Sequence, residues 1–130
     1  MHPPARRLCQ LAALLLALAT IIGALGAHGL KPRLSADHFE VLQTAVHYQF
    51  FQSLGLLALA LLLDRYPQRT LQLAGWLLFA GVVLFCGSLY AILAGAPRLV
   101  GVLTPLGGVA MISAWCLTAW SLSGPQDSPR

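Results

Sequence analysis

Four long apolar stretches constrain this sequence more than any other feature. They cover about residues 8–27, 44–63, 71–94 and 99–122, and each is close to the roughly 20 residues that a helix needs to cross a hydrocarbon core about 30 Å thick. Only 9% of the residues are charged, which is too few to cover a soluble globular surface. Because backbone in lipid must satisfy its own hydrogen bonds, the sequence predicts an all-α, polytopic membrane protein, a compact bundle of four transmembrane helices.

The basic residues all lie between or outside these stretches, where they set orientation and meet lipid headgroups. In a four-span chain, one side of the membrane would carry Arg6, Arg7, Arg65, Arg69 and Arg130, and the other Lys31, Arg33 and Arg98. The excess of positive charge favours both termini in the cytoplasm of a multi-pass plasma-membrane protein, in bacteria the inner membrane. No basic face with interleaved aromatic residues is present, so we expect the lipid bilayer, and not nucleic acid, as the partner.

The N-terminal end admits two interpretations. Residues 1–7 contain two arginines and are predicted to be a short cytoplasmic segment before the first span. The small residues around Ala24 and Gly26 resemble a signal-peptide cleavage site, so removal of the first stretch is the alternative. The apolar run is longer than a usual signal peptide requires, and its length favours a retained span. At the end of this span, His28 is predicted to cap the helix carbonyls.

Small residues mark the expected contacts between helices. Ala19, Gly23 and Ala27 recur at four-residue spacing on one face of the first helix, and Gly107 and Gly108 stand together in the fourth. Helices in lipid associate through such residues because small side chains let two backbones approach closely. These five residues are therefore predicted to be helix-packing positions.

The second apolar stretch is predicted to be part of a helix longer than the membrane is thick. Ser35 is its expected N-cap, and no helix-breaking residue follows until residue 63. A helix over residues 36–63 would measure roughly 42 Å. Since this exceeds the hydrocarbon thickness, residues 36–43 are expected to form an interfacial helical start and residues 44–63 the span.

Polar residues of this long helix fall on two roughly opposite faces. One face carries Glu40, Gln43, Thr44 and His47, and the other carries His38, Gln49, Gln52 and Ser53. Two polar faces imply two neighbouring helices to contact, so the second helix is predicted to be central in the bundle. His47 is the deepest ionisable residue, and ionisable groups at membrane depth point to function.

The last two spans are predicted to form a helical hairpin around the tight turn at residues 95–98. Tyr90, near the end of the third span, is expected at the membrane interface. Pro105 cannot donate a backbone hydrogen bond and would leave the carbonyl of Gly101 free, so a kink is expected there. The hydroxyl of Thr104 could compensate for that loss. Residues 123–130 are predicted to be a disordered tail.

The sequence contains no recognisable catalytic motif. It has no phosphate-binding glycine loop, no HExxH and no GxSxG, so we expect no enzymatic activity and no cofactor. A metal site at His38, Glu40 and His47 is disfavoured because the two histidines would lie on opposite sides of one helix. Three cysteines lack CxxC spacing and are interpreted as small apolar packing residues, namely Cys9, Cys86 and Cys116.

Four short motifs resemble the YgdD-like family, a group of small four-span membrane proteins with a domain of unknown function. They are Gly-Ala-Leu-Gly-Ala-His-Gly-Leu at 23–30, Leu-Gln-Thr-Ala-Val-His-Tyr-Gln at 42–49, Leu-Phe-Cys-Gly-Ser-Leu-Tyr at 84–90 and Thr-Pro-Leu-Gly-Gly at 104–108. The resemblance covers about residues 8–122. It implies the fold, the membrane location and retention of the first span, but no reaction. Family members often carry other polar residues at His47 and Gln52, so no single ionisable group is implied to be essential.

Two hypotheses for function follow. The first is a non-enzymatic membrane component that acts through helix packing, as a homo-oligomer or within a larger membrane complex. The alternative is a protein that binds a small ligand or conducts protons or ions through intramembrane polar residues, namely Glu40, Gln43, His47, Gln49, Gln52 and Thr104.

Overall fold

The computed structural model describes residues 1–125, and its regular structure there is entirely helical. The elements are α1 (Pro3–Leu25) continued by a π-helical turn (Gly26–Leu30), α2 (Ala36–Arg65), α3 (Arg69–Leu93), a 3-10 turn (Arg98–Val102) and α4 (Leu103–Ser123). Four helices are long and apolar enough to cross a membrane. The predicted all-α fold with four spans is therefore confirmed.

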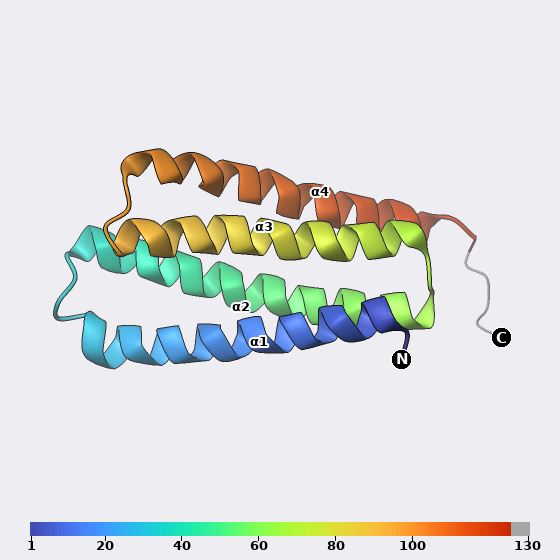
Figure 1. The fold of residues 1–130 in the computed structure, drawn as a ribbon, viewed down its shortest axis with the longest axis horizontal. Coiled ribbons are helices and arrows are strands. Elements are labelled where there is room, and N and C mark those ends of the chain that lie inside the picture. Colours follow the sequence, from blue (N-terminus) through green and yellow to red (C-terminus); the bar gives the residue numbers. More distant parts are fainter. Residues whose placement is uncertain (126–130) are drawn as a thin grey trace.

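The four helices lie side by side, each antiparallel to the next along the chain (Figure 1). α2 packs against both α1 and α3, and α3 packs against both α2 and α4. The predicted central place of the second helix is confirmed, and α3 shares it. The N-terminus, the end of α4 and the α2–α3 connector lie at one end of the bundle (Figure 1), where the backbone N–H of His2 donates to the carboxylate of Asp64 at 2.8 Å.

The core follows a seven-residue repeat in α1. Ala5, Ala12, Ala19 and Gly26 are all buried at this spacing, which is the period that keeps one helix face on its neighbours in left-handed packing. Leu8, from the same face, is fully buried among leucines of α2 and α3. α1 begins at Pro3, inside the segment predicted to precede the span, because proline fits the first turn of a helix.

The α1–α2 connection confirms one prediction and corrects another. Ser35 is the N-cap of α2, and its hydroxyl accepts a hydrogen bond from the backbone N–H of His38 at 3.2 Å. His28, predicted to cap the end of the first helix, is exposed, and its side chain forms no hydrogen bond within residues 1–125. The backbone itself satisfies those carbonyls, since the N–H of Lys31 donates to the Gly26 carbonyl at 3.0 Å.

Pro105 does not interrupt a running α-helix, as the predicted kink required. The chain forms a 3-10 turn up to Val102, and α4 begins at Leu103, so Pro105 lies in the first turn of α4. A backbone N–H has no helical partner in that turn, and proline is tolerated there. The reversal before it uses Gly95, whose φ of 99° favours glycine. Residues 126–130, most of the predicted tail, lie outside the described residues.

Candidate functional site

Gln49, on the inner face of α2, joins three helices. Its side-chain amide donates to the backbone carbonyl of Leu15 in α1 at 2.7 Å, and its oxygen accepts a hydrogen bond from the hydroxyl of Tyr90 in α3 at 2.6 Å. Gln49 is only 3% exposed. With both ends of its amide paired in this way, Gln49 fixes the relative positions of the helices that flank α2.

Other polar pairs connect the remaining helices. The indole N–H of Trp115 in α4 donates to the side-chain oxygen of Gln52 at 2.8 Å, and the Cys86 thiol donates to the Ala45 carbonyl at 3.3 Å. A further hydrogen bond joins the hydroxyls of Thr104 in α4 and Ser88 in α3. Thr104 thus pairs across the hairpin rather than compensating for Pro105.

Sequence reasoning missed the partners of these residues. Tyr90 was expected at the interface, yet its hydroxyl points inward to Gln49. The sequence spacing in α3 could have indicated this, because Cys86 and Tyr90 are four residues apart and therefore share one helix face. Both form hydrogen bonds to α2. Ser88 entered the prediction only as part of the motif at residues 84–90, without a partner.

The other three candidate polar residues lie on the outer face of α2. Glu40, Gln43 and His47 are exposed, and none of their side chains forms a hydrogen bond or ion pair within residues 1–125. Glu40 borders a shallow depression shared with Thr44 and with Leu89 of α3. The six candidates therefore do not meet in one place: Gln49, Gln52 and Thr104 are each hydrogen-bonded to a neighbouring helix, and the other three face outward.

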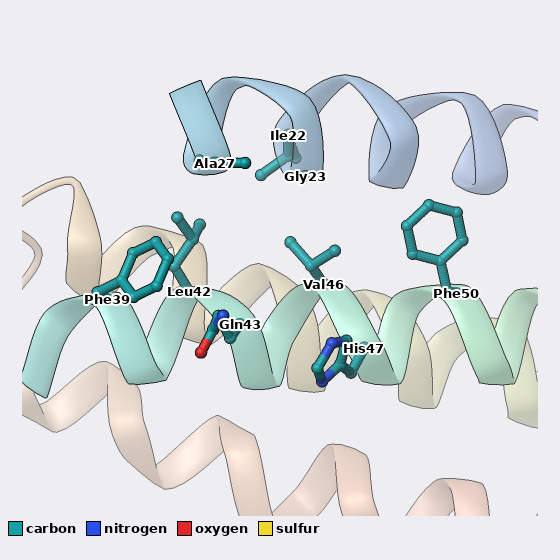
Figure 2. Close-up of a pocket in the computed structure, with 10 residues that line it drawn as sticks. Ile22, Gly23, Ala27, Phe39, Leu42, Gln43, Val46, His47 and Phe50 are labelled. Atoms are coloured by element: carbon teal, nitrogen blue, oxygen red, sulfur yellow. The ribbon is translucent and has the colours of Figure 1, made fainter. Parts of the chain in front are cut away.

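Gln43 and His47 border a groove of about 230 Å³ between α1 and α2. Its lining residues are mostly apolar, and they are Ile22, Gly23, Gly26, Ala27, Phe39, Leu42, Gln43, Val46, His47 and Phe50. Figure 2 shows the side chains of Leu42, Val46 and Phe50 pointing from α2 towards α1, with Gln43 and His47 on a different side of α2. The groove is thus apolar along its length, and two polar side chains lie at its edge.

The predicted packing residues divide between tight and open contacts. Ala19 is fully buried, and a Cβ on Gly23 would lie 3.4 Å from a methyl group of Val46. Ala27 is exposed, and Gly26 is buried instead, because the buried face of α1 follows a seven-residue repeat rather than four-residue steps. In α4, Gly107 is buried, while Gly108 is half-buried.

Gly107 is at the closest contact between α3 and α4. A Cβ there would lie 2.5 Å from the backbone nitrogen of Phe85 and 2.7 Å from the backbone carbonyl oxygen of Gly81. A Cβ on Gly108 would meet only the Phe85 ring, at 4.0 Å. The first of the two glycines therefore allows the backbones to touch, and the second does not.

The depth of His47 makes its exposure costly. The 30 residues of α2 span about 45 Å, so a hydrocarbon core of about 30 Å leaves roughly 7 Å of helix outside at each end. His47 follows Ala36 by eleven residues, which places it about 9 Å inside the hydrocarbon. Ionisable residues at such depth usually face a neighbouring helix or a water-filled cavity.

The described residues contain no group of three or more histidine, cysteine, aspartate or glutamate side chains that could hold a metal ion. His38 and His47 are both exposed on α2.

Comparison with known proteins agrees with the membrane fold. Residues 22–108 match a family described as a protein of unknown function (DUF423). The UPF0382 membrane protein YwdK of Bacillus subtilis is 43% identical over 101 residues, covering 77% of this chain and 82% of that protein. The UPF0382 inner membrane protein YgdD of Escherichia coli is 36% identical over 96 residues, covering 74% and 73%. These matches confirm the resemblance identified from the four motifs. No solved structure matches the chain significantly.

Proposed function

This chain belongs to the DUF423 family of membrane proteins, and we propose that it is a non-enzymatic membrane component that assembles with a second copy of itself through the α1–α2 groove. One observation carries the proposal. Gln43 and His47 lie unpaired beside the groove, with His47 about 9 Å inside the hydrocarbon. A polar group in that place gains free energy when a protein neighbour covers it.

A second copy suits this face because its two polar groups complement each other. The Gln43 amide has both a donor and an acceptor, and so does a neutral His47 imidazole. In a two-fold symmetric dimer, a contact between one residue and another occurs twice. Gln43 of each copy could therefore pair with His47 of the other, which satisfies all four side chains at once.

The experiment measures self-association of the protein in lipid vesicles by energy transfer between labelled copies. Gln43→Leu and His47→Leu, made singly, should each weaken association by about tenfold, because both pairs are lost and cross-helix hydrogen bonds contribute up to about 1.7 kcal/mol. Ser113→Leu is the matched control: Ser113 is exposed on α4, away from the groove, and this variant should associate normally.

Mixing the two variants provides a sharper test. A Gln43→Leu copy retains His47, and a His47→Leu copy retains Gln43, so one of the two pairs can form in the mixed dimer. The mixture should associate more strongly than either variant alone. Equal association of all samples, or a wild-type protein that remains monomeric at high protein density, would exclude the symmetric pairing.

The apolar groove favours a second candidate function, the binding of a small membrane-soluble ligand. Its volume of about 230 Å³ would hold part of an aliphatic chain, and Gln43 and His47 could hydrogen-bond to a polar headgroup on that chain. Native mass spectrometry of protein released gently from its own membranes separates the two functions. A dimer supports assembly, whereas a monomer that carries a specific small molecule, lost in His47→Leu, supports ligand binding.

The proposed orientation has both termini in the cytoplasm. The N-terminus, the end of α4 and the α2–α3 connector lie at one end of the bundle (Figure 1). Arg6 and Arg7 belong to the first turns of α1, Arg65 ends α2 and Arg69 begins α3, so all four lie at this end. Basic residues flanking spans are retained on the cytoplasmic side. A fluorescent protein fused to the C-terminus should therefore fold and emit, and an alkaline phosphatase fusion at the same place should be inactive. The opposite pair of results would reverse the orientation.

A further inference from the structure

A second surface feature lies at the other end of the bundle, in the crevice between α1 and α3. Both helices pack on α2, and they touch each other where Leu8 meets Gly75: a Cβ on Gly75 would lie 2.5 Å from a methyl carbon of Leu8. Beside this contact the helices leave a crevice of about 640 Å³. It is lined by Arg7, Gln10, Leu11, Ala13, Leu14 and Trp76.

Three hydrogen-bond donors without acceptors border this crevice. The guanidinium of Arg7, the amide of Gln10 and the indole N–H of Trp76 form no hydrogen bond or ion pair within residues 1–125. Trp115 differs, because its indole N–H donates to Gln52. The Trp76 ring is held in place by an edge-to-face contact with Phe79, with centroids 6.2 Å apart. The crevice therefore offers a set of donors and a positive charge.

The depth of these groups matches a lipid headgroup. α1 and its π-helical continuation contain 28 residues, or about 42 Å, so the hydrocarbon boundary lies roughly four residues from the end, near Arg7. Gln10 and Trp76 follow just inside that boundary, where indole rings are favoured. Leu11 and Leu14 continue along the same crevice into the hydrocarbon. Polar donors thus come first and apolar side chains follow, in the order that a phospholipid presents phosphate and acyl chain.

We propose that the α1–α3 crevice binds one anionic phospholipid, with its phosphate against Arg7, Gln10 and Trp76 and one acyl chain along Leu11 and Leu14. The planar guanidinium recognises phosphate oxygens through paired hydrogen bonds. A headgroup with net negative charge is preferred because Arg7 has no acidic partner. This site is separate from the α1–α2 groove, and it does not depend on the proposed self-association.

The test uses the full-length protein labelled with 5-fluorotryptophan in nanodiscs of phosphatidylcholine, in which a growing fraction is replaced by phosphatidylglycerol. The fluorine resonance of Trp76 should shift as the phosphatidylglycerol fraction increases, and the shift should level off once the site is full. The resonance of Trp120, exposed on α4 at the same end of the bundle, should remain in place and reports bulk lipid effects. Each resonance is assigned by replacing one tryptophan with phenylalanine.

Arg7→Gln should weaken the phosphatidylglycerol response of Trp76 at least tenfold, because it removes the charge-assisted hydrogen bonds from the guanidinium to the phosphate. Arg69→Gln is the matched control, since Arg69 lies at the same end but borders a different depression. This control should leave the Trp76 response unchanged. Parallel shifts of Trp76 and Trp120, or equal effects of Arg7→Gln and Arg69→Gln, would show only general attraction of anionic lipid and overturn the site.

Discussion

The two helical hairpins, α1 with α2 and α3 with α4, both place glycine at their contacts but reach different results. In α3–α4, Gly107 faces backbone atoms of Gly81 and Phe85, and the two backbones touch. In α1–α2, Gly23 faces the side chain of Val46, which keeps the helices apart and leaves the groove open. A glycine therefore brings two helix backbones into contact where it faces backbone atoms, and not where it faces a β-branched side chain such as that of Val46.

The hairpins differ in their polar residues as well. The hydroxyls of Ser88 and Thr104 bond to each other across α3–α4. Beside the α1–α2 groove, Gln43 and His47 have no partner within residues 1–125. The polar side chains at the contact between α3 and α4 are thus paired, whereas those beside the α1–α2 groove are not, and this difference is the reason that the proposed self-association uses α1 and α2.

The largest effect on stability is expected where the backbones touch. Gly107→Ala should destabilise the protein by about 3 kcal/mol, the upper part of the range for overpacking, because the added Cβ meets backbone atoms that cannot rotate away. Gly108→Ala, its neighbour, should change stability by less than about 1 kcal/mol. Unfolding in mixed micelles with increasing SDS, followed by circular dichroism, measures both. Equal losses would mean that the α3–α4 contact is not closed at Gly107.

An intermediate effect on stability is expected at Gln49, whose side chain hydrogen-bonds to both hairpins. Gln49→Leu removes the hydrogen bonds to Leu15 and Tyr90 and should cost about 1–2 kcal/mol, since intramembrane hydrogen bonds average about 0.6 kcal/mol and an orphaned hydroxyl adds to the loss.

A double-mutant cycle with Tyr90→Phe isolates the Gln49–Tyr90 contribution in the same unfolding assay. Once Gln49 is leucine, removal of the Tyr90 hydroxyl should cost little. Full additivity of the two single effects would mean that the pair contributes no coupling energy.

The smallest effect on stability is expected in the open hairpin. Gly23→Leu should change the stability of the monomer by less than about 1 kcal/mol, because its Cβ would stand at ordinary contact distance and the rest of the side chain would enter the groove. Self-association, measured by cross-linking in vesicles, should nevertheless fall because the groove is filled. Unaltered cross-linking would show that the groove does not mediate self-association.

Much of the fold could be predicted because each feature depends on local sequence. The spans follow from apolar runs, the start of α2 from the N-capping Ser35, and the α3–α4 reversal from the glycine at 95. Pro105 misled the prediction because its effect depends on where the helix begins. Two residues before it, the helix has only just started, and proline is harmless.

The pairing of polar residues could be predicted only in part. Helical periodicity placed Gln43 and His47 on one face and Gln49 and Gln52 on another, and the structure separates them in the same way. Periodicity cannot say which face turns inward, because that depends on the rotation of α2 against its neighbours. The partner Tyr90 depends in addition on the relative height of α3, which no local pattern encodes.

The hydrogen bond between the His2 backbone and Asp64 has a consequence for biosynthesis. It joins residues 62 positions apart, and at roughly 5–20 residues per second the ribosome needs about 3–12 s to make the chain between them. The first helix therefore enters the membrane several seconds before its partners in α2 and α3 exist. During that interval its row of alanine and glycine residues faces lipid or the insertion machinery.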